Sequence, residues 1–196
     1  MSETLLITGF DPFGGESINP AWEAAKCLPG HVGKYDLCAL QVPTVFGEAS
    51  RLAMAKAEEV HPSVILCIGQ AGGRAAVTPE MIGINLRYAS IPDNAGNRPQ
   101  DVPCVQGGPD AYFSTLPVRR MAQAIADIGI SAAVSCTAGT FVCNDLLYCL
   151  LHRYHDTQVR CGFIHVPYLP EQAKNNQPSM ALCDIVRALR AAIEAL

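Results

Sequence analysis

Apolar residues fall into two kinds of pattern along this chain. Runs rich in apolar residues predict strands at residues 4–10, 35–42, 64–69 and 160–166, of which 4–10 is expected to be buried and 64–69 is fully apolar. Apolar residues at helical spacing predict helices at residues 20–28, 44–60, 117–128, 143–154 and 179–195. Because continuous apolar strands that alternate with helices are typical of parallel sheets, we expect an α/β fold. It would be a single doubly wound domain over residues 1–196, with a mostly parallel central sheet and helices on both faces.

Turn and capping residues set the limits of several of these elements. Asn19 before Pro20 supplies a helix cap with proline at the first helical position, and Thr44 can cap the helix that follows it. From residue 72 to residue 117 the pattern loosens. Residues 81–89 predict a strand, residues 132–135 predict another, and the Pro- and Gly-rich remainder predicts one long excursion. Loops of that length are usually functional or disordered.

Composition narrows the class of protein. With 49% hydrophobic and 16% charged residues, the 196-residue chain can bury one core of ordinary size. No apolar run reaches membrane-spanning length, and Glu3 stands where a signal peptide would be basic. A formal net charge of −4 argues against a nucleic-acid partner. Nine cysteines without the spacing of a disulfide scaffold predict reduced thiols and a cytoplasmic location.

The stretch around Cys143 carries the strongest signal for chemistry. A turn of small residues, Ala138-Gly139-Thr140, precedes the predicted helix that Cys143 begins. The positive end of a helix dipole favours thiolate over thiol, and the thiolate is the nucleophile. We therefore expect Cys143 to be activated by its place at the helix start.

A nucleophilic cysteine needs a base, and His165 is the best placed of the five histidines. His165 ends a predicted strand at the sheet edge where doubly wound domains bind ligands. His152 and His155 are on the predicted helix that Cys143 begins, but they lie about 13 Å or more from the thiol along the helix axis. His31 falls in a predicted surface loop, and His61 precedes a proline.

The acid that would orient the imidazole is less sharply defined by sequence. Glu80 is a lone carboxylate directly before an apolar stretch, which makes it a good candidate. Asp145 lies two residues after the thiol on the same predicted helix and would face another direction. Asp11 and Asp93 remain candidates for the orienting acid on the basis of their spacing alone.

Several segments together resemble a known family. The run from Ser135 to Asn144, with Tyr148, is similar to the cysteine motif of pyroglutamyl peptidase I. Residues 8–15 with Asn19-Pro20 resemble that family's opening, and residues 69–74, 91–94 and 162–167 resemble later landmarks. The resemblance runs over nearly the whole chain.

The resemblance implies a cysteine peptidase that removes an N-terminal pyroglutamyl residue from peptides. Cys143 would be the nucleophile, His165 the base and then the acid, and Glu80 the group that orients His165. No metal or cofactor is implied. The partners would be N-terminally pyroglutamylated peptides, and the protein would be a homo-oligomer, a dimer or a tetramer, with the long excursion as a candidate interface.

The resemblance also implies a substrate pocket. Phe10 and Phe13 would hold the two faces of the lactam ring, which fits a flat neutral ring that needs apolar faces and a few polar groups at its edge. The other residues implied for the pocket are Asn19, Gln70, Phe141 and Val142.

Two departures from the family pattern leave a second hypothesis open. Met81 and Gly83 stand where the glutamate motif usually has a basic residue and an alanine. Ser90 stands where the family often has an arginine that stabilises the oxyanion; the backbone N–H of Cys143 would still donate, and Arg87 is a candidate substitute. The alternative function is a non-catalytic binder of pyroglutamyl or related cyclic amides.

Overall fold

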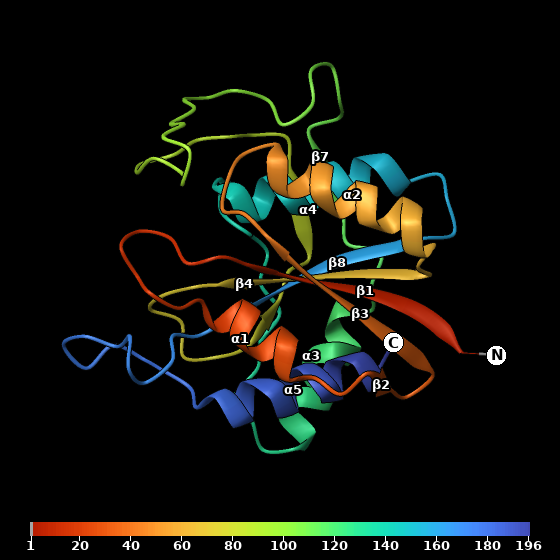
Figure 1. The fold of residues 1–196 in the computed structure, drawn as a ribbon, viewed down its shortest axis with the longest axis vertical. Helices are drawn as coiled ribbons and strands as arrows, with labels where there is room; N and C mark the ends of the chain where they lie inside the picture. The colour runs from red at the N-terminus through yellow and green to blue at the C-terminus, as the bar shows by residue number, and fades with distance from the viewer. Residues whose placement is uncertain (1) are drawn as a thin grey trace.

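The computed structural model describes residues 2–196 and is built on a six-stranded sheet of order β2-β3-β1-β4-β8-β5 (Figure 1). Strands β3, β1, β4 and β8 are mutually parallel, whereas β2 and β5 pair antiparallel at the two edges. The mostly parallel α/β sheet is therefore confirmed, and its short edge strands were not predicted. The strands are β1 (Glu3–Phe10), β2 (His31–Val32), β3 (Tyr35–Val42), β4 (Val64–Gln70), β5 (Thr78–Pro79) and β8 (Arg160–Val166).

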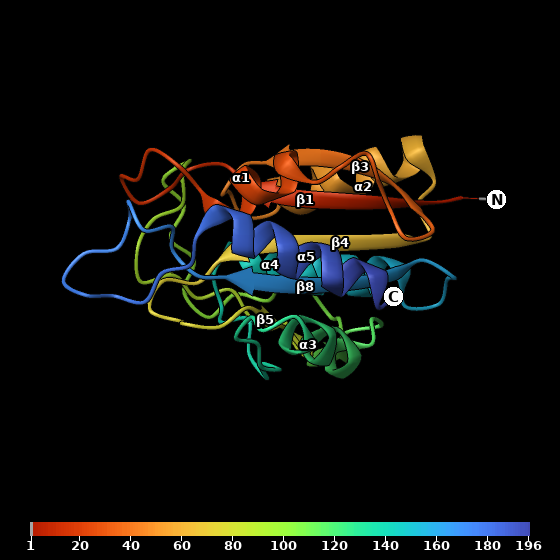
Figure 2. The same cartoon turned by 90° about the horizontal axis from the view of Figure 1, so that it is seen from below.

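Helices cover both faces of the sheet, as predicted. Helices α1 (Pro20–Cys27), α3 (Val118–Asp127) and α5 (Leu182–Glu194) pack on one face, and α2 (Glu48–Val60) and α4 (Val142–Tyr154) pack on the other (Figure 1). Figure 2 shows α1, α5 and α3 across the face that is the lower one in Figure 1. None of the helices within residues 2–196 is long and apolar enough to cross a membrane.

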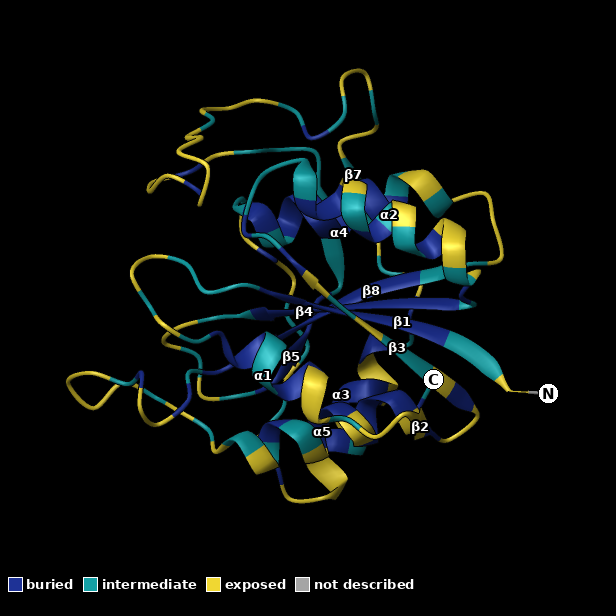
Figure 3. Cartoon of the chain, in the orientation of Figure 1, coloured by how far each residue is buried: buried dark blue, intermediate teal, exposed yellow. Residues whose placement is uncertain are grey.

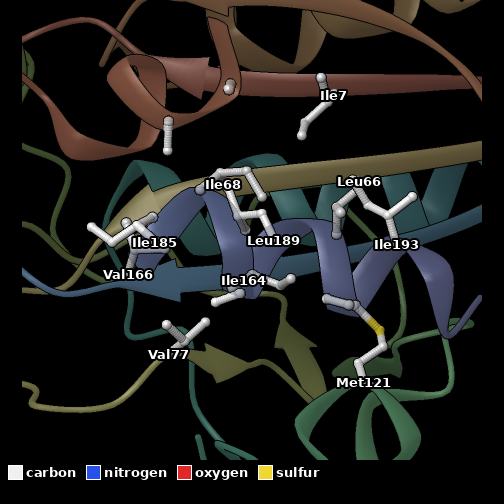
Figure 4. Close-up of a cluster of buried hydrophobic side chains, with 14 of the residues drawn as sticks. Ile7, Leu66, Ile68, Val77, Met121, Ile164, Val166, Ile185, Leu189 and Ile193 are labelled. Atoms are coloured by element: carbon white, nitrogen blue, oxygen red, sulfur yellow. The ribbon is translucent and has the colours of Figure 1, made fainter. Parts of the chain in front are cut away.

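The two faces explain why the central strands are apolar without interruption. Successive side chains of a strand point to opposite faces, so Leu5 and Ile7 enter one core while Leu6 enters the other. In Figure 4 the side chains of β4 and β8 pack against Ile185 and Leu189 of α5. Figure 3 shows β1, β4 and β8 largely buried, whereas exposed residues lie on outer helix faces, in loops and on β3.

Helix α2 begins later than predicted. Its N-cap is Gly47, and Thr44 does not cap it. The Thr44 backbone N–H donates to Asp11 Oδ1 at 2.6 Å, and the Thr44 hydroxyl donates to the Asp11 carbonyl at 3.2 Å. The prediction for Thr44 is wrong because this residue joins two loops instead of starting a helix.

Two of the predicted strands are also wrong in extent. Residues 132–135 make only isolated bridges, at Ala132 and Ser135. Of residues 81–89, only β6 (Ile82–Ile84) is a strand, and it pairs with β7 (Ala111–Phe113) in a separate two-stranded sheet. The Asn144 side chain binds the backbone of Ile84 and the carbonyl of Leu86, which takes the groups that a longer strand would use.

The long excursion has little regular structure, but hydrogen bonds attach it to the rest of the fold. Asp93 accepts hydrogen bonds from the backbone N–H groups of Phe46, Ala95 and Asn97. The Tyr148 hydroxyl on α4 donates to the Pro109 carbonyl at 2.6 Å. The excursion therefore lies over α4, as Figure 1 shows above the sheet.

We predict that Gly9→Ala destabilises the fold whereas Gly30→Ala does not. A Cβ at Gly9 would lie 2.7 Å from Trp22 Cα and 2.8 Å from Trp22 N, so α1 would have to move away from β1. A Cβ at Gly30 would meet nothing within 4 Å. Urea unfolding should show a loss of about 1–3 kcal/mol for Gly9→Ala and almost none for Gly30→Ala. Equal stability of the two variants would contradict the close approach of α1.

Candidate active site

His165 and Glu80 form a buried hydrogen-bonded pair at the carboxyl end of β8. The distance from His165 Nδ1 to Glu80 Oε1 is 2.7 Å, and the two residues are 4% and 0% exposed. The antiparallel pairing of β5 places Thr78 opposite His165, and the backbone N–H of Glu80 then donates to the Phe163 carbonyl. The edge strand β5, which was not predicted, is thus what brings Glu80 to the imidazole.

Cys143 reaches the same edge from the other side, as the second residue of α4. The parallel register of β4 and β8 sets Gly69 beside His165. A Cβ at Gly69 would come within 3.0 Å of Cys143 Sγ and within 2.6 Å of the Phe163 ring. The absence of a side chain at Gly69 therefore gives the thiol room next to the strand that carries His165.

The rival carboxylates are engaged elsewhere. Asp145 forms an ion pair with Arg87 at 2.6 Å and accepts from the Gly47 backbone N–H at 2.8 Å. Asp11 accepts from Thr44, and Asp93 binds within its own loop. Among the four acids that sequence left as candidates, Glu80 is the one bonded to His165.

Desolvation disfavours the charged forms of both the Cys143 thiol and the His165 imidazole. Burial, reinforced by the charge of Glu80, raises the pKa of the Cys143 thiol to about 12. Burial also lowers the pKa of His165, although its hydrogen bond to Glu80 acts in the opposite direction. Desolvation of the charged form therefore opposes the effect expected of the helix start on the Cys143 thiol.

The Glu80 carboxyl stays ionised despite its burial. Desolvation alone would raise its pKa, but the hydrogen bond and charge of His165 and the hydrogen bond from Arg74 lower it below the usual value. Arg74 Nη1 donates to Glu80 Oε1 at 2.6 Å. Sequence reasoning missed Arg74, because nothing in the local pattern shows that a loop arginine turns back onto Glu80.

Three aromatic rings form a row in front of α4. The ring centroids of Phe13 and Phe141 are 6.1 Å apart, and Phe46 meets Phe141 edge to face at 5.2 Å. Phe10 is separate from this row: it is 2% exposed and packs on Phe163 with a centroid distance of 6.4 Å. Phe46 was not predicted, since the sequence around it carries no motif.

The other predicted pocket residues differ in the contacts that their side chains make. Asn19 is the N-cap of α1, accepting from the Ala21 N–H, and its amide donates to the Asp11 carbonyl. Val142 is fully buried. Gln70 Oε1 accepts a hydrogen bond from Gln172 Nε2 at 3.0 Å.

Gln172 fixes the orientation of the Gln70 amide, and sequence reasoning missed it. Gln172 is 3% exposed; its Nε2 donates to the Ile18 carbonyl, and its Oε1 accepts from the Leu169 N–H. These backbone partners allow only one orientation of the Gln172 amide. Its second N–H therefore needs an oxygen on Gln70, which leaves Gln70 Nε2 as a free donor.

The start of α4 offers backbone donors but no charged substitute for the arginine position. Phe141, the N-cap residue, makes no side-chain capping bond. Ser90 is exposed, and Arg87 Nε is bound to Asp145. The first N–H groups of a helix lack partners within the helix, so they are the natural anion site here.

An α/β fold with a thiol, an imidazole and a buried carboxylate at one sheet edge has the arrangement of a cysteine hydrolase. Comparison with known sequences narrows this class. The chain belongs to the pyroglutamyl peptidase family, whose sequence model matches residues 3–196.

Individual relatives agree with the family assignment. A pyrrolidone-carboxylate peptidase of Bacillus thuringiensis (strain Al Hakam) is 52% identical, over 98% of this chain and 92% of that protein. The crystal structure of Bacillus amyloliquefaciens pyroglutamyl peptidase I superposes with a TM-score of 0.95 at 47% identity, covering 99% of this chain and 96% of the other. The pyrrolidone carboxyl peptidase of Thermococcus litoralis gives a TM-score of 0.94 at 35% identity, covering 98% and 92%.

Proposed function

We propose that this protein is a cysteine peptidase that hydrolyses the amide bond after an N-terminal pyroglutamyl residue. The observation that carries the proposal is the buried bond from His165 Nδ1 to Glu80 Oε1 beside Cys143, in a chain of the pyroglutamyl peptidase family. A non-catalytic binder of cyclic amides would have no need for an ionised carboxylate held against a histidine. The geometry thus favours the enzyme over the binder.

Glu80 sets the imidazole in the form that the reaction needs. A carboxylate at Nδ1 accepts a hydrogen bond from the N–H of that nitrogen, so Nε2 of the neutral ring is the acceptor. Nε2 takes the Cys143 proton as Sγ attacks the substrate carbonyl, and Glu80 stabilises the resulting imidazolium. His165 then protonates the leaving amine, and water activated by the same imidazole hydrolyses the thioester.

We assign the oxyanion site to the backbone N–H groups at the start of α4. The helix begins at Val142 and has no side-chain cap, so the Cys143 N–H is available to a developing negative charge. This assignment needs no arginine at Ser90. It leaves Arg87 in its ion pair with Asp145, where it holds α4 in place.

The pocket for the lactam ring combines aromatic faces with one oriented amide. Phe13 and Phe141, with Phe46 behind, supply apolar faces, and Gln70 Nε2 donates to the ring carbonyl. The buried side chains of Phe10, Asn19 and Val142 support the walls. A reducing, cytoplasmic location belongs to the same proposal, because all nine cysteines are unpaired.

Replacing the nucleophile gives the direct test of function. Cys143→Ser should lower the release of a chromogenic amine from a pyroglutamyl amide by at least about a thousandfold, because the acyl-enzyme can no longer form efficiently. Cys27→Ser, at an exposed thiol on α1, should keep wild-type activity. Undiminished turnover by Cys143→Ser would refute the assignment, and stoichiometric heat without product in the wild type would support the binder.

Gln172→Met should weaken selection for the lactam carbonyl. Without its partner, Gln70 is free to turn its oxygen toward the pocket, so KM for a pyroglutamyl amide should rise about tenfold, the value of one hydrogen bond. A prolyl amide lacks that carbonyl and should change little. Gln177→Met, at an exposed glutamine, is the control. Equal losses on both substrates would argue against an oriented Gln70.

We propose a homo-oligomer that uses the long excursion. Large apolar side chains are exposed in and beside it, namely Tyr88, Ile91, Val102 and Phe113, the last 70% exposed. Light scattering should give a mass of two or four times 20.9 kDa, and Phe113→Asp should lower it. A wild-type monomer at micromolar concentration would exclude this arrangement.

A further inference from the structure

Arg74 lies outside the proposed triad, yet its guanidinium contacts three segments that build it. Nη1 donates to Glu80 Oε1 and to Thr78 Oγ1, both at 2.6 Å, and Nη2 donates to the Thr137 carbonyl at 3.1 Å. Thr78 is the residue paired with His165 between β5 and β8. Thr137 lies in the turn that leads to α4. One side chain thus joins the acid, the strand beside the base and the turn before the nucleophile.

The hydrogen bonding of Glu80 depends on one oxygen. Oε1 accepts from both His165 and Arg74, whereas Oε2 is buried without a hydrogen-bond partner among residues 2–196. Arg74 therefore supplies one of the two hydrogen bonds that the carboxylate receives. The Arg74 side chain is 31% exposed, so water solvates part of the cation while Glu80 is fully buried.

We propose that Arg74 is a positioning residue of the catalytic machinery. It keeps the Glu80 carboxylate ionised and aligned on His165, and through Thr137 it fixes the approach of the chain to Cys143. This inference rests on the proposed function, and it adds a fourth residue whose contacts run through Glu80 and not to the substrate.

The chemistry of proton transfer shows why a cation is useful at this place. When Sγ gives its proton to Nε2, the new imidazolium donates from Nδ1 to Glu80, and transfer of that proton on to the carboxylate would remove the stabilising charge. A guanidinium on the same oxygen disfavours a neutral Glu80. The proton then stays on His165 until the leaving amine takes it.

The positive charge of Arg74 also affects the pKa values of His165 and Cys143. The charged and titratable groups that act on His165 are Glu80 and Arg74, and those that act on Cys143 are Glu80, Cys67 and Arg74. The positive charge of Arg74 lowers the pKa of both His165 and the Cys143 thiol. Removing that charge should move both titrations to higher pH.

The test compares Arg74→Met, which removes the charge at similar length, with Arg74→Lys, which keeps it. For Arg74→Met, kcat on a pyroglutamyl amide should fall roughly tenfold or more with little change in KM, since a hydrogen bond to a charged group is lost away from the pocket. Both limbs of the kcat/KM profile should move to higher pH. Arg74→Lys should keep the wild-type limbs and recover part of kcat. Arg119→Met, at an exposed arginine on α3, should match the wild type in both respects.

A second readout does not depend on peptidase activity. The rate of Cys143 alkylation by iodoacetamide, located by peptide mass mapping, should rise with pH later in Arg74→Met than in wild type. If the wild type cleaves no pyroglutamyl amide, the proposed function fails while this profile still decides the role of Arg74. An unchanged profile in a folded Arg74→Met, or the same displacement in Arg74→Met and Arg74→Lys, would overturn the inference.

Discussion

The buried carboxylate of Glu80 is the constraint on which the candidate site depends. A charge withdrawn from water costs several kcal/mol unless donors replace the lost solvent. Here the donors come from β8 and from the loop after β4, so the His165 imidazole and the Arg74 guanidinium must meet at one oxygen. The loop from Arg74 to Glu80 and the distant strand β8 are thereby held in a single arrangement.

The nucleophile is fixed by a second set of buried polar groups. The two residues after Cys143 point away from the sheet edge and into the loops over α4. Asn144 binds the backbone of Ile84 and Leu86, and Asp145 binds Arg87 and the Gly47 N–H. Because buried polar groups are costly without partners, these bonds fix the helix start relative to the excursion. Asn144 and Asp145 therefore have structural roles, and the histidine that lies near the thiol comes from β8.

Local patterns predicted the regular parts of this fold, and long-range polar contacts decided the rest. The strands at residues 35–42 and 160–166 match prediction in extent, and the second is buried on both faces, as a continuous apolar run indicates. The prediction that Thr44 caps a helix was wrong because a cap signal uses only neighbouring residues, whereas the actual partner of Thr44, Asp11, lies 33 residues earlier. Cys143, His165 and Glu80 stood out through motif and edge position. Gln172 and Phe46 did not, because they act through contacts with Gln70 and Phe141, which are distant in sequence. Arg74 did not because its contacts with Thr78 and Glu80 depend on the path of an irregular loop, which no local motif reports.

Cys143 differs from the other buried thiols in its neighbours and not in its acidity. Burial raises the pKa of Cys67 to about 12, as it does for Cys143, so acidity does not distinguish the two. What distinguishes Cys143 is its place near His165, whose imidazole is hydrogen-bonded to Glu80. In the proposed mechanism, thiolate formation is coupled to attack, and the developing negative charge passes from sulfur to an oxygen that faces the α4 N–H groups. Because desolvation disfavours the charged forms of both groups, the proposed mechanism forms those charges as the bond to the substrate forms.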